Sequence, residues 1–294
     1  MWRIIDIGSD DVILRSDKNN LLIQQEDKKT IVHLSDVSCV LVHNNSTLIS
    51  KNAINILADN KVPCVFCDEK HMPKSILLPI SAHYHQTERC IAQANLKEAA
   101  KKKIWKAIVK AKIKGQAEVL HTDIDKKYLT NLISTVKSGD TTNRESVSAR
   151  YYWQKVFGDN FRRNPDQSGL NAHLNYGYAI LRAVVARYLV SVGLNPALGV
   201  FHCNKLNNFC LADDVMEPFR PIVDKIVYDN HTQWVGALIP EAKRQLAEIV
   251  IHPVIINGDI YPLHKAIEKC CSSLSFYMCG QTENLVLPDT LFVK

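Results

Sequence analysis

The stretch from residue 171 to residue 224 constrains the fold of this chain more than any other. Its first half places apolar side chains at steps of three and four residues, which predicts a helix with one apolar face. Gly193 and Pro196 are expected to end this helix. We expect the rest of the chain to form the structure that holds this stretch in place. The apolar positions are Leu174, Tyr178, Leu181, Val185, Tyr188 and Val192.

The second half of the stretch carries groups that bind metals. His202 lies in a short connection, and the acidic residues Asp213, Asp214 and Glu217 follow it. Residues three and four positions apart share one face of a helix, so these carboxylates are expected to crowd together. A histidine and several carboxylates beside an apolar wall are what a divalent metal site needs.

Each of these groups also has a purely structural interpretation. A histidine such as His202, taken alone, is more often a hydrogen-bonded structural residue than a metal ligand. Asp213 and Asp214 can stabilise the start of a helix through its macrodipole. Glu217 precedes Pro218, and proline is tolerated chiefly in the first turn of a helix, so we expect a helix start close to these residues.

Glu145 is a further candidate acid at the start of a predicted helix. One face of this helix contains Glu145, Ala149, Tyr152 and Val156, so a carboxylate lies at the N-terminal end of the apolar face. The segment Thr142-x-x-Glu145 also matches a capping box, in which the glutamate binds a backbone N–H group. The sequence pattern leaves capping and metal binding open for this residue.

The composition is that of a globular chain without a membrane segment. A chain of 294 residues can bury a sizeable core and is expected to form two domains. No apolar run reaches the length of a membrane span, and the first residues do not resemble a secretory signal. The nine cysteines are odd in number and irregularly spaced, so we expect the reducing environment of the cytoplasm.

The pattern predicts an α+β fold with two parts. Residues 1–80 contain short apolar runs separated by turn-forming residues, which is typical of a small sheet, and one helix at 46–59 that Ser46 or Ser50 caps. Residues 81–86 are a predicted linker, and residues 87–294 are predicted to be a larger, all-helical catalytic domain. Cys64-Val-Phe-Cys67 has no second CxxC to complete a zinc site, so both cysteines are expected in a strand.

Basic residues are unevenly distributed along the chain. Residues 97–114 contain eight lysines and one acid, Glu98, whereas the whole chain has a formal charge of +6. Such a segment is consistent with a phosphate-binding surface, although a solvated helix face has the same pattern. The candidate DNA contacts are Lys101, Lys102, Lys103, Lys106, Lys110, Lys112, Lys114, Arg162 and Arg163.

Four segments together resemble the CRISPR-associated integrase, the catalytic subunit of the spacer-acquisition complex, and most closely its type II branch. They are Glu145-x-x-x-Ala149-x-x-Tyr152-Trp153, Leu174-Asn-Tyr-Gly-Tyr-Ala-Ile-Leu181, Gly193-Leu-Asn-Pro-Ala-Leu-Gly199 with His202, and Leu211-Ala-Asp-Asp-Val-Met-Glu-Pro-Phe-Arg-Pro221.

This resemblance implies a site and a reaction. Glu145, His202 and Glu217 would hold Mg²⁺ or Mn²⁺, and Asp214 would support them. A DNA 3′-hydroxyl would attack a phosphodiester of the CRISPR repeat and displace another 3′-hydroxyl, inserting a spacer.

The resemblance also implies partners. They are double-stranded DNA, both as spacer precursor and as repeat, a second copy of the chain held by a dimerising β-rich domain, and a small second adaptation protein that bridges two dimers. The type II effector nuclease is a further candidate partner, and no membrane is expected. Two other functions stay open: a general metal-dependent DNA repair nuclease, and a non-catalytic nucleic-acid-binding scaffold.

Overall fold

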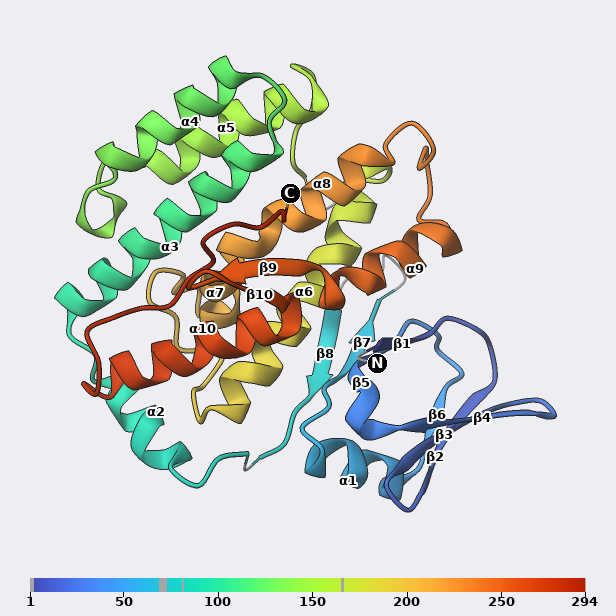
Figure 1. Ribbon diagram of the computed structural model, residues 1–294. Helices are drawn as coiled ribbons and strands as arrows, with labels where there is room; N and C mark the ends of the chain where they lie inside the picture. Colours follow the sequence, from blue (N-terminus) through green and yellow to red (C-terminus); the bar gives the residue numbers. More distant parts are fainter. Residues whose placement is uncertain (1–2, 69–72, 81, 165–166, 294) are drawn as a thin grey trace.

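The computed structural model describes residues 3–68, 73–80, 82–164 and 167–293. Its N-terminal region is rich in β-strands, and the remainder is mostly helical (Figure 1). Among the described helices, none is long and apolar enough to span a membrane. Ser81 of the predicted linker lies outside the described residues, and the division into two domains stays a prediction.

The first N-terminal sheet separates two hydrophobic cores. Its strand order is β1-β5-β7-β8, with parallel pairing of β1, β5 and β7 and antiparallel pairing of β8. Val40 and Val42 of β5 face a small N-terminal core, whereas Cys39 and Leu41 face the large helical core. Because alternate side chains of a strand point to opposite faces, β5 is buried along its whole length. The strands are β1 (Arg3–Ile7), β5 (Val37–Val42), β7 (Cys64–Cys67) and β8 (Pro73–Leu77).

The second N-terminal sheet is a three-stranded meander with one short added strand. Its order is β4-β3-β2-β6, and Lys18 and Glu26 adopt positive φ angles in the two hairpin turns. Ser50 caps helix α1, which confirms one of the two predicted caps. The elements are β2 (Val12–Asp17), β3 (Asn20–Gln25), β4 (Lys28–His33), η1 (Leu34–Asp36), β6 (Leu48–Ile49) and α1 (Lys51–Asp59).

The C-terminal part is built around α6, the helix that the apolar stripe predicts. All but four of its residues are buried, because other elements cover it on every side. Gly177 permits close packing: an added Cβ would lie 2.4 Å from Val223 of α8. The helices are α2 (Gln86–Ala94), α3 (Glu98–Val119), α4 (Asp123–Thr135), η2 (Ser138–Asp140), α5 (Arg144–Phe157), α6 (Leu170–Ser191), α7 (Cys210–Met216), η3 (Glu217–Phe219), α8 (Arg220–Asp229), α9 (Pro240–Ala247), η4 (Glu248–Ile251) and α10 (Leu263–Met278).

The C-terminal part is not all-helical, so that prediction is wrong. An antiparallel hairpin, β9 (Pro253–Ile256) and β10 (Asp259–Pro262), lies between η4 and α10. Asn257 and Gly258 both have positive φ angles in its two-residue turn. An Asn-Gly pair between apolar residues is a strong hairpin signal, and it was present in the sequence.

Polar contacts join α6 to the first sheet. Arg187 is buried, and its guanidinium donates hydrogen bonds of 2.7 Å to the carbonyl oxygens of both Val37 and Ser38. Tyr176 donates a hydrogen bond of 2.8 Å to the carboxylate of Asp6 on β1. These contacts fix the orientation of α6, and with it the helices packed around α6, relative to the sheet.

We predict that Arg187→Met lowers the free energy of unfolding by about 2–4 kcal/mol, because it leaves two buried carbonyl oxygens without their charged donor. Chemical denaturation of the purified protein measures the change. Arg150→Met, which replaces an exposed arginine of α5, is the control and should change the value by less than about 0.5 kcal/mol. Equal effects of the two substitutions would contradict the assignment.

Candidate active site

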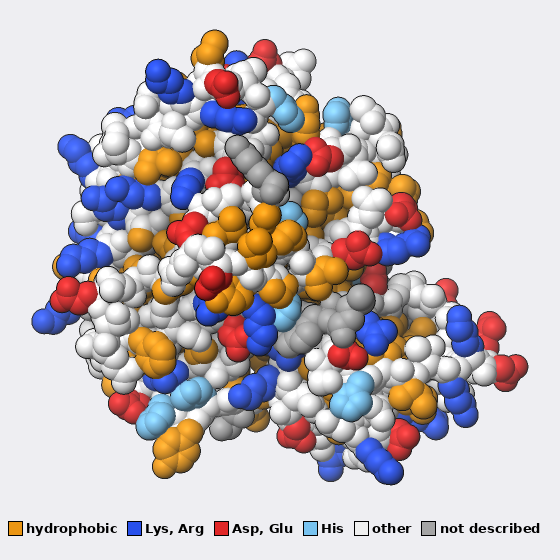
Figure 2. Space-filling model, in the orientation of Figure 1, with side chains coloured by type: hydrophobic (Ala, Val, Ile, Leu, Met, Phe, Trp, Pro, Cys, Tyr) orange, Lys and Arg blue, Asp and Glu red, His pale blue; other side chains and the backbone are white. Residues whose placement is uncertain are grey.

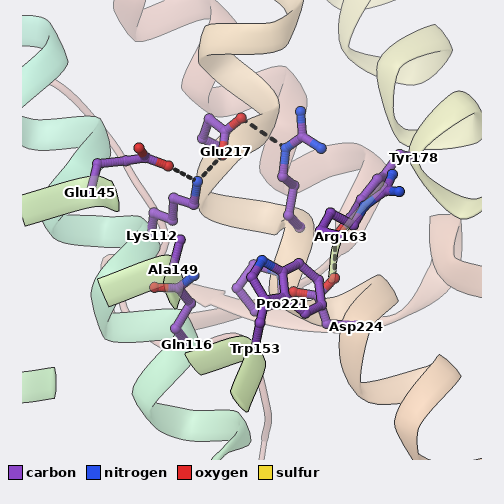
Figure 3. A pocket seen from close by; sticks show the side chains of 11 residues that line it. Lys112, Gln116, Glu145, Ala149, Trp153, Arg163, Tyr178, Glu217, Pro221 and Asp224 are labelled. Atoms are coloured by element: carbon purple, nitrogen blue, oxygen red, sulfur yellow. Dashed lines mark hydrogen bonds and ion pairs between the residues drawn. The ribbon is translucent and has the colours of Figure 1, made fainter. Parts of the chain in front are cut away.

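Three helical segments each turn one face toward a single cavity of about 170 Å³ (Figure 3). Most of the lining residues of each segment are three or four positions apart, so they lie on one face of their helix. A loop arginine and a tyrosine of α6 complete the wall. The lining residues are Lys112 and Gln116 of α3, Glu145, Ala149 and Trp153 of α5, Glu217 of η3, Arg220, Pro221 and Asp224 of α8, Arg163, and Tyr178.

The predicted residues Glu145 and Glu217 meet at one end of this cavity. The buried ammonium of Lys112 donates a hydrogen bond to Glu145 and lies 2.6 Å from Oε2 of Glu217 (Figure 3). Burial alone would lower the pKa of Lys112, but the charges of Glu217 and Glu145 outweigh burial and raise it. The two carboxylates, far apart in the sequence, therefore share one cation.

The carboxylate of Glu217 is held ionised inside the protein. It is buried, and its Oε1 lies 2.8 Å from Nε of Arg220. Burial opposes ionisation, but the charges of Arg220 and Lys112 prevail and hold the pKa of Glu217 at about 2. Its Oε2 accepts no hydrogen bond within the described part of the chain and contacts Lys112 only as an ion pair.

Glu145 is positioned by Asp140, not by a capping box. Asn143 precedes α5 in a left-handed conformation, and the two carboxylate oxygens of Asp140 accept the N–H groups of Arg144 and Glu145 at 2.8 and 2.9 Å. The hydroxyl of Thr142 instead donates to the carbonyl of Thr135. The capping-box interpretation is therefore wrong, and the side chain of Glu145 is available to Lys112.

His202 is oriented by the fully buried Asp214. The Asp214 carboxylate accepts the backbone N–H groups of Val200, Phe201 and His202, and its Oδ1 lies 2.6 Å from Nδ1 of His202. The hydrogen bond to Asp214 raises the pKa of His202 despite partial burial. Because the carboxylate oxygens of Asp214 accept hydrogen bonds, Nδ1 of His202 carries the proton and Nε2 is the ring nitrogen that can bind a ligand.

Gly199 allows the loop that carries His202 to close around Asp214. A Cβ at Gly199 would lie 2.2 Å from the carbonyl oxygen of His202 and 3.0 Å from Oδ2 of Asp214. Those approaches exclude any larger residue without movement of the backbone. The glycine and the buried aspartate together fix the histidine.

The acidic residues of this stretch do not crowd one face, which corrects the sequence-based expectation. Asp213 pairs with Arg182 and Asn207, each at 2.7 Å, while Asp214 binds the histidine loop. Glu217 lies where α7 ends and the short η3 turn begins, with Pro218 next to it. The proline thus coincides with a break between helices, and each carboxylate has its own partners.

The donor set fits a hard divalent cation in chemistry, although the three predicted ligands do not meet. No three His, Cys, Asp or Glu side chains in the described ranges form a metal-binding group. Two carboxylates already share one cationic group, and the charge of Glu217 helps to raise the pKa of the oriented imidazole of His202. Oxygen ligands with one imidazole suit Mg²⁺ or Mn²⁺. Glu145, Glu217 and Nε2 of His202 would hold it.

The opposite side of the cavity is cationic and aromatic. The guanidinium groups of Arg220 and Arg163 lie 4.5 and 5.3 Å from the ring centre of Tyr178. The Tyr178 hydroxyl donates to Asp224, and burial raises the pKa of Asp224 to about 6. Guanidinium groups therefore line the cavity beside its carboxylates, with Arg220 paired to Glu217, and planar guanidinium groups of this kind can bind a phosphate.

The predicted DNA contacts are only partly at the surface. Lys101, Lys102, Lys103, Lys106, Lys110, Lys114 and Arg162 are exposed or half-buried, and Lys and Arg side chains gather along the edge of the molecule where α3 lies (Figure 2). Lys112 and Arg163 differ from the expected surface contacts. Lys112 is buried between carboxylates, and Arg163 donates to Asn171 and Asn175.

Sequence reasoning missed the roles of Lys112, Gln116, Asp140 and Arg220. A signal for the first two was present, because Lys112 and Gln116 continue the buried stripe of Trp105 and Ile108 along α3. Polar residues on an apolar stripe point inward and often mark a site. Asp140 had no such signal, since its capping contact depends on the left-handed turn before α5.

Comparisons with known proteins identify the family of the chain. The family described as CRISPR associated protein Cas1 matches residues 7–234. A CRISPR-associated endonuclease Cas1 of Neisseria meningitidis is 38% identical over 286 residues, which cover 94% of this chain and 93% of that protein.

Two solved structures share the fold. A casposase bound to its integration product superimposes with a TM-score of 0.81 at 20% identity, covering 96% of this chain and 92% of that one. A chain of a Cas6-RT-Cas1–Cas2 complex gives a TM-score of 0.73 at 18% identity, covering 96% of this chain and 35% of that one. The matched family pattern and the Neisseria relative establish that the chain belongs to the Cas1 family of CRISPR-associated endonucleases.

Proposed function

We propose that this chain is a metal-dependent DNA integrase that inserts spacer DNA into a CRISPR repeat array. One observation carries the proposal: Glu145 and Glu217, from different helices, converge on a single buried cationic group. The named integration product of the casposase neighbour supports strand transfer as the reaction class. The same site acting on water instead of a DNA end would make the protein an endonuclease, as the Neisseria relative is named.

The chain's own residues hold and orient the reacting groups. Glu145 and Glu217 supply oxygen ligands, and Asp214 fixes the proton of His202 on Nδ1 so that Nε2 can bind. Arg220 is anchored to Glu217 through Nε, which orients its terminal N–H groups for a phosphate. A bound divalent cation would supply charge stabilisation and a more acidic nucleophilic hydroxyl.

In this reaction a DNA 3′-hydroxyl attacks a phosphodiester of the repeat. A new P–O bond forms, the old one breaks, and a 3′-hydroxyl leaves with the proton. Two attacks, one on each strand, require paired sites, so we propose that the protein acts as a homodimer. The Cas1–Cas2 assembly of a structural neighbour supports a small second protein as a bridge between dimers, and we also propose the type II effector nuclease as a partner.

The integration assay tests the function most directly. Purified protein with its small partner and Mn²⁺ should join a short duplex to a supercoiled plasmid that carries the repeat. Plasmid nicking without any joined product would instead favour a repair nuclease, and inactivity together with DNA binding would favour a scaffold.

We predict that His202→Ala and Glu217→Gln each reduce joining by at least about 100-fold, because each removes a proposed metal ligand. Asp214→Asn should reduce it by about 10- to 100-fold, since it disturbs the orientation of the imidazole. His231→Ala, at an exposed histidine, is the matched control and should retain joining. Retained activity in Glu217→Gln would refute the site.

A thermal shift separates metal binding from activity. Mn²⁺ should raise the melting temperature of the wild type. Lys112→Met should melt at a lower temperature without metal, because two facing carboxylates lose their shared cation. Its upward shift with Mn²⁺ should exceed that of the wild type, since no ammonium competes. Lys103→Met, at an exposed position of α3, serves as control; the same shift in all variants would count against a cation between Glu145 and Glu217.

Surface lysines of α3 are expected to contact phosphates. Replacing Lys106 and Lys110 by alanine should weaken DNA binding regardless of sequence and lower the slope of log affinity against log salt by about 0.9 per lysine. Fluorescence anisotropy at several salt concentrations gives the slope. Lys28→Ala, on an exposed position of β4, should leave it unchanged. An unchanged slope in the α3 variants would place the DNA elsewhere.

A further inference from the structure

One face of α2 holds the backbone of the segment that leads from α6 to His202. The Arg89 guanidinium donates a hydrogen bond of 2.8 Å to the carbonyl oxygen of Val192. Gly193 follows with a φ of +75°, and a Cβ added there would lie 3.1 Å from Cα of Gln86. The helix therefore lies directly against this segment. The residues of this face are three or four positions apart: Gln86, Arg89, Cys90 and Gln93.

Gln93 makes the main contacts of this face. It is only 3% exposed, and its amide binds the backbone at both ends of one turn. Its Nε2 donates to the carbonyl oxygens of Asn195 and Leu198 at 2.9 and 2.8 Å, and its Oε1 accepts the N–H group of Asn195 at 2.9 Å. Helix α7 holds the middle of the same turn, since the N–H group of Leu211 donates to the carbonyl oxygen of Pro196 at 2.8 Å. A single buried side chain thus fixes where the turn begins and ends.

This turn passes directly into the loop that Asp214 binds. The carbonyl group of Leu198 and the nitrogen of Gly199 belong to one planar peptide unit. The next three N–H groups, those of residues 200–202, all donate to the carboxylate of Asp214. The loop is also tightly packed, because a Cβ at Gly199 would lie 2.2 Å from the carbonyl oxygen of His202. A displacement of the Leu198 carbonyl would therefore move the N–H groups that Asp214 accepts.

Trp105 of α3 holds the other end of the loop. Its ring stacks on that of Phe201, with ring centres 4.0 Å apart, and it meets the His202 ring edge-on at 5.8 Å. Because Trp105 is buried, the imidazole lies against a wall that is itself held in place by the core. Aromatic contacts therefore hold the loop at His202, whereas the polar contacts of Gln93 hold the start of the loop.

We propose that Gln93 is a positioning residue for strand transfer, acting through the backbone of this loop. By holding the Leu198 carbonyl, it keeps the N–H groups of residues 200–202 directed at Asp214, and Asp214 fixes the tautomer and direction of the His202 imidazole. The inference rests on the proposed function, which gives His202 its role as a metal ligand. Helix α2 thereby contributes to the site although none of its described residues lines the cavity.

Amide hydrogen exchange in EDTA tests the link between Gln93 and the loop without metal or DNA. Gln93→Met keeps the length of the side chain and removes its amide. The backbone amides of residues 200–202 should exchange about ten-fold faster in this variant than in the wild type, because the turn no longer holds them at Asp214. Thr87→Met, at an exposed position of α2, is the matched control and should leave these rates unchanged.

Two outcomes of the exchange experiment would overturn the proposal. Faster exchange confined to residues 195–198 would mean that Gln93 stabilises its own turn and nothing beyond it. Equal acceleration along the whole of α6 would mean that Gln93 serves general stability. Gln93→Asn keeps the amide on a shorter side chain that cannot span the same distance, and it replaces Gln93→Met in the same comparison if that variant does not fold.

A double-mutant cycle connects the loop to the reaction. Gln93→Met alone should reduce the joining of a radiolabelled duplex by about ten-fold, because it disturbs the orientation of the imidazole. In the His202→Ala background it should reduce the residual joining by less than about two-fold, since the group that it positions is already absent. Equal losses in the two backgrounds would mean that Gln93 acts independently of His202, and would refute the positioning role.

The two proposals fail separately. Faster exchange at residues 200–202 in Gln93→Met, together with a wild type that joins no DNA, would keep the link between Gln93 and the loop and reject the integrase. Joining that depends on His202 but is unchanged in Gln93→Met would keep the integrase and reject the positioning role.

Discussion

A buried ammonium between two carboxylates is the interaction on which the rest of this site depends. Lys112 of α3 contacts Glu145 of α5 and Glu217 between α7 and α8, so it ties three segments together. Removing charges from water costs several kcal/mol for each ion, and only close partners offset that cost. The arrangement is therefore poor as a means of stabilisation. It is consistent with the role that we propose, in which the two carboxylates are held close together to bind a metal ion.

The surrounding fold holds these segments in register. Helix α6 is covered on all sides, Gly177 brings α8 against it, and Arg187 and Tyr176 bind it to the first sheet. Side chains of β5 pack into both hydrophobic cores. A shift of the sheet would therefore disturb the packing of both cores. The described part of the N-terminal region thus supports the site without contributing a side chain to the cavity lining.

The sequence predicted the helices, strands and caps better than it predicted the contacts between side chains of distant segments. The stripe of α6, the cap at Ser50 and the strand that contains Cys64 and Cys67 follow from local rules of spacing and turn chemistry. The hairpin at Asn257 and Gly258 obeyed those rules too and was overlooked. The pairing of Glu145 with Glu217 depends on tertiary contacts between distant segments, so only the family resemblance pointed to it.

The remaining site features are set by geometry that no local pattern encodes. Adjacent residues Asp213 and Asp214 bind different partners because the helix turns their side chains in different directions. Glu217 is ionised because the charges of Arg220 and Lys112 lower its pKa more than burial raises it. Arg220 is close to Glu217 in the sequence, whereas Lys112 belongs to a distant helix. Neither outcome is visible in spacing alone.

Anomalous X-ray diffraction from crystals grown with Mn²⁺ and DNA tests the central claim most directly. The account predicts one strong peak bounded by Glu145, Glu217 and Nε2 of His202, with the ammonium of Lys112 displaced from between the two carboxylates. A fully occupied Lys112 bridge with no peak beside it, in crystals that show Mn²⁺ bound elsewhere on the protein, would contradict it.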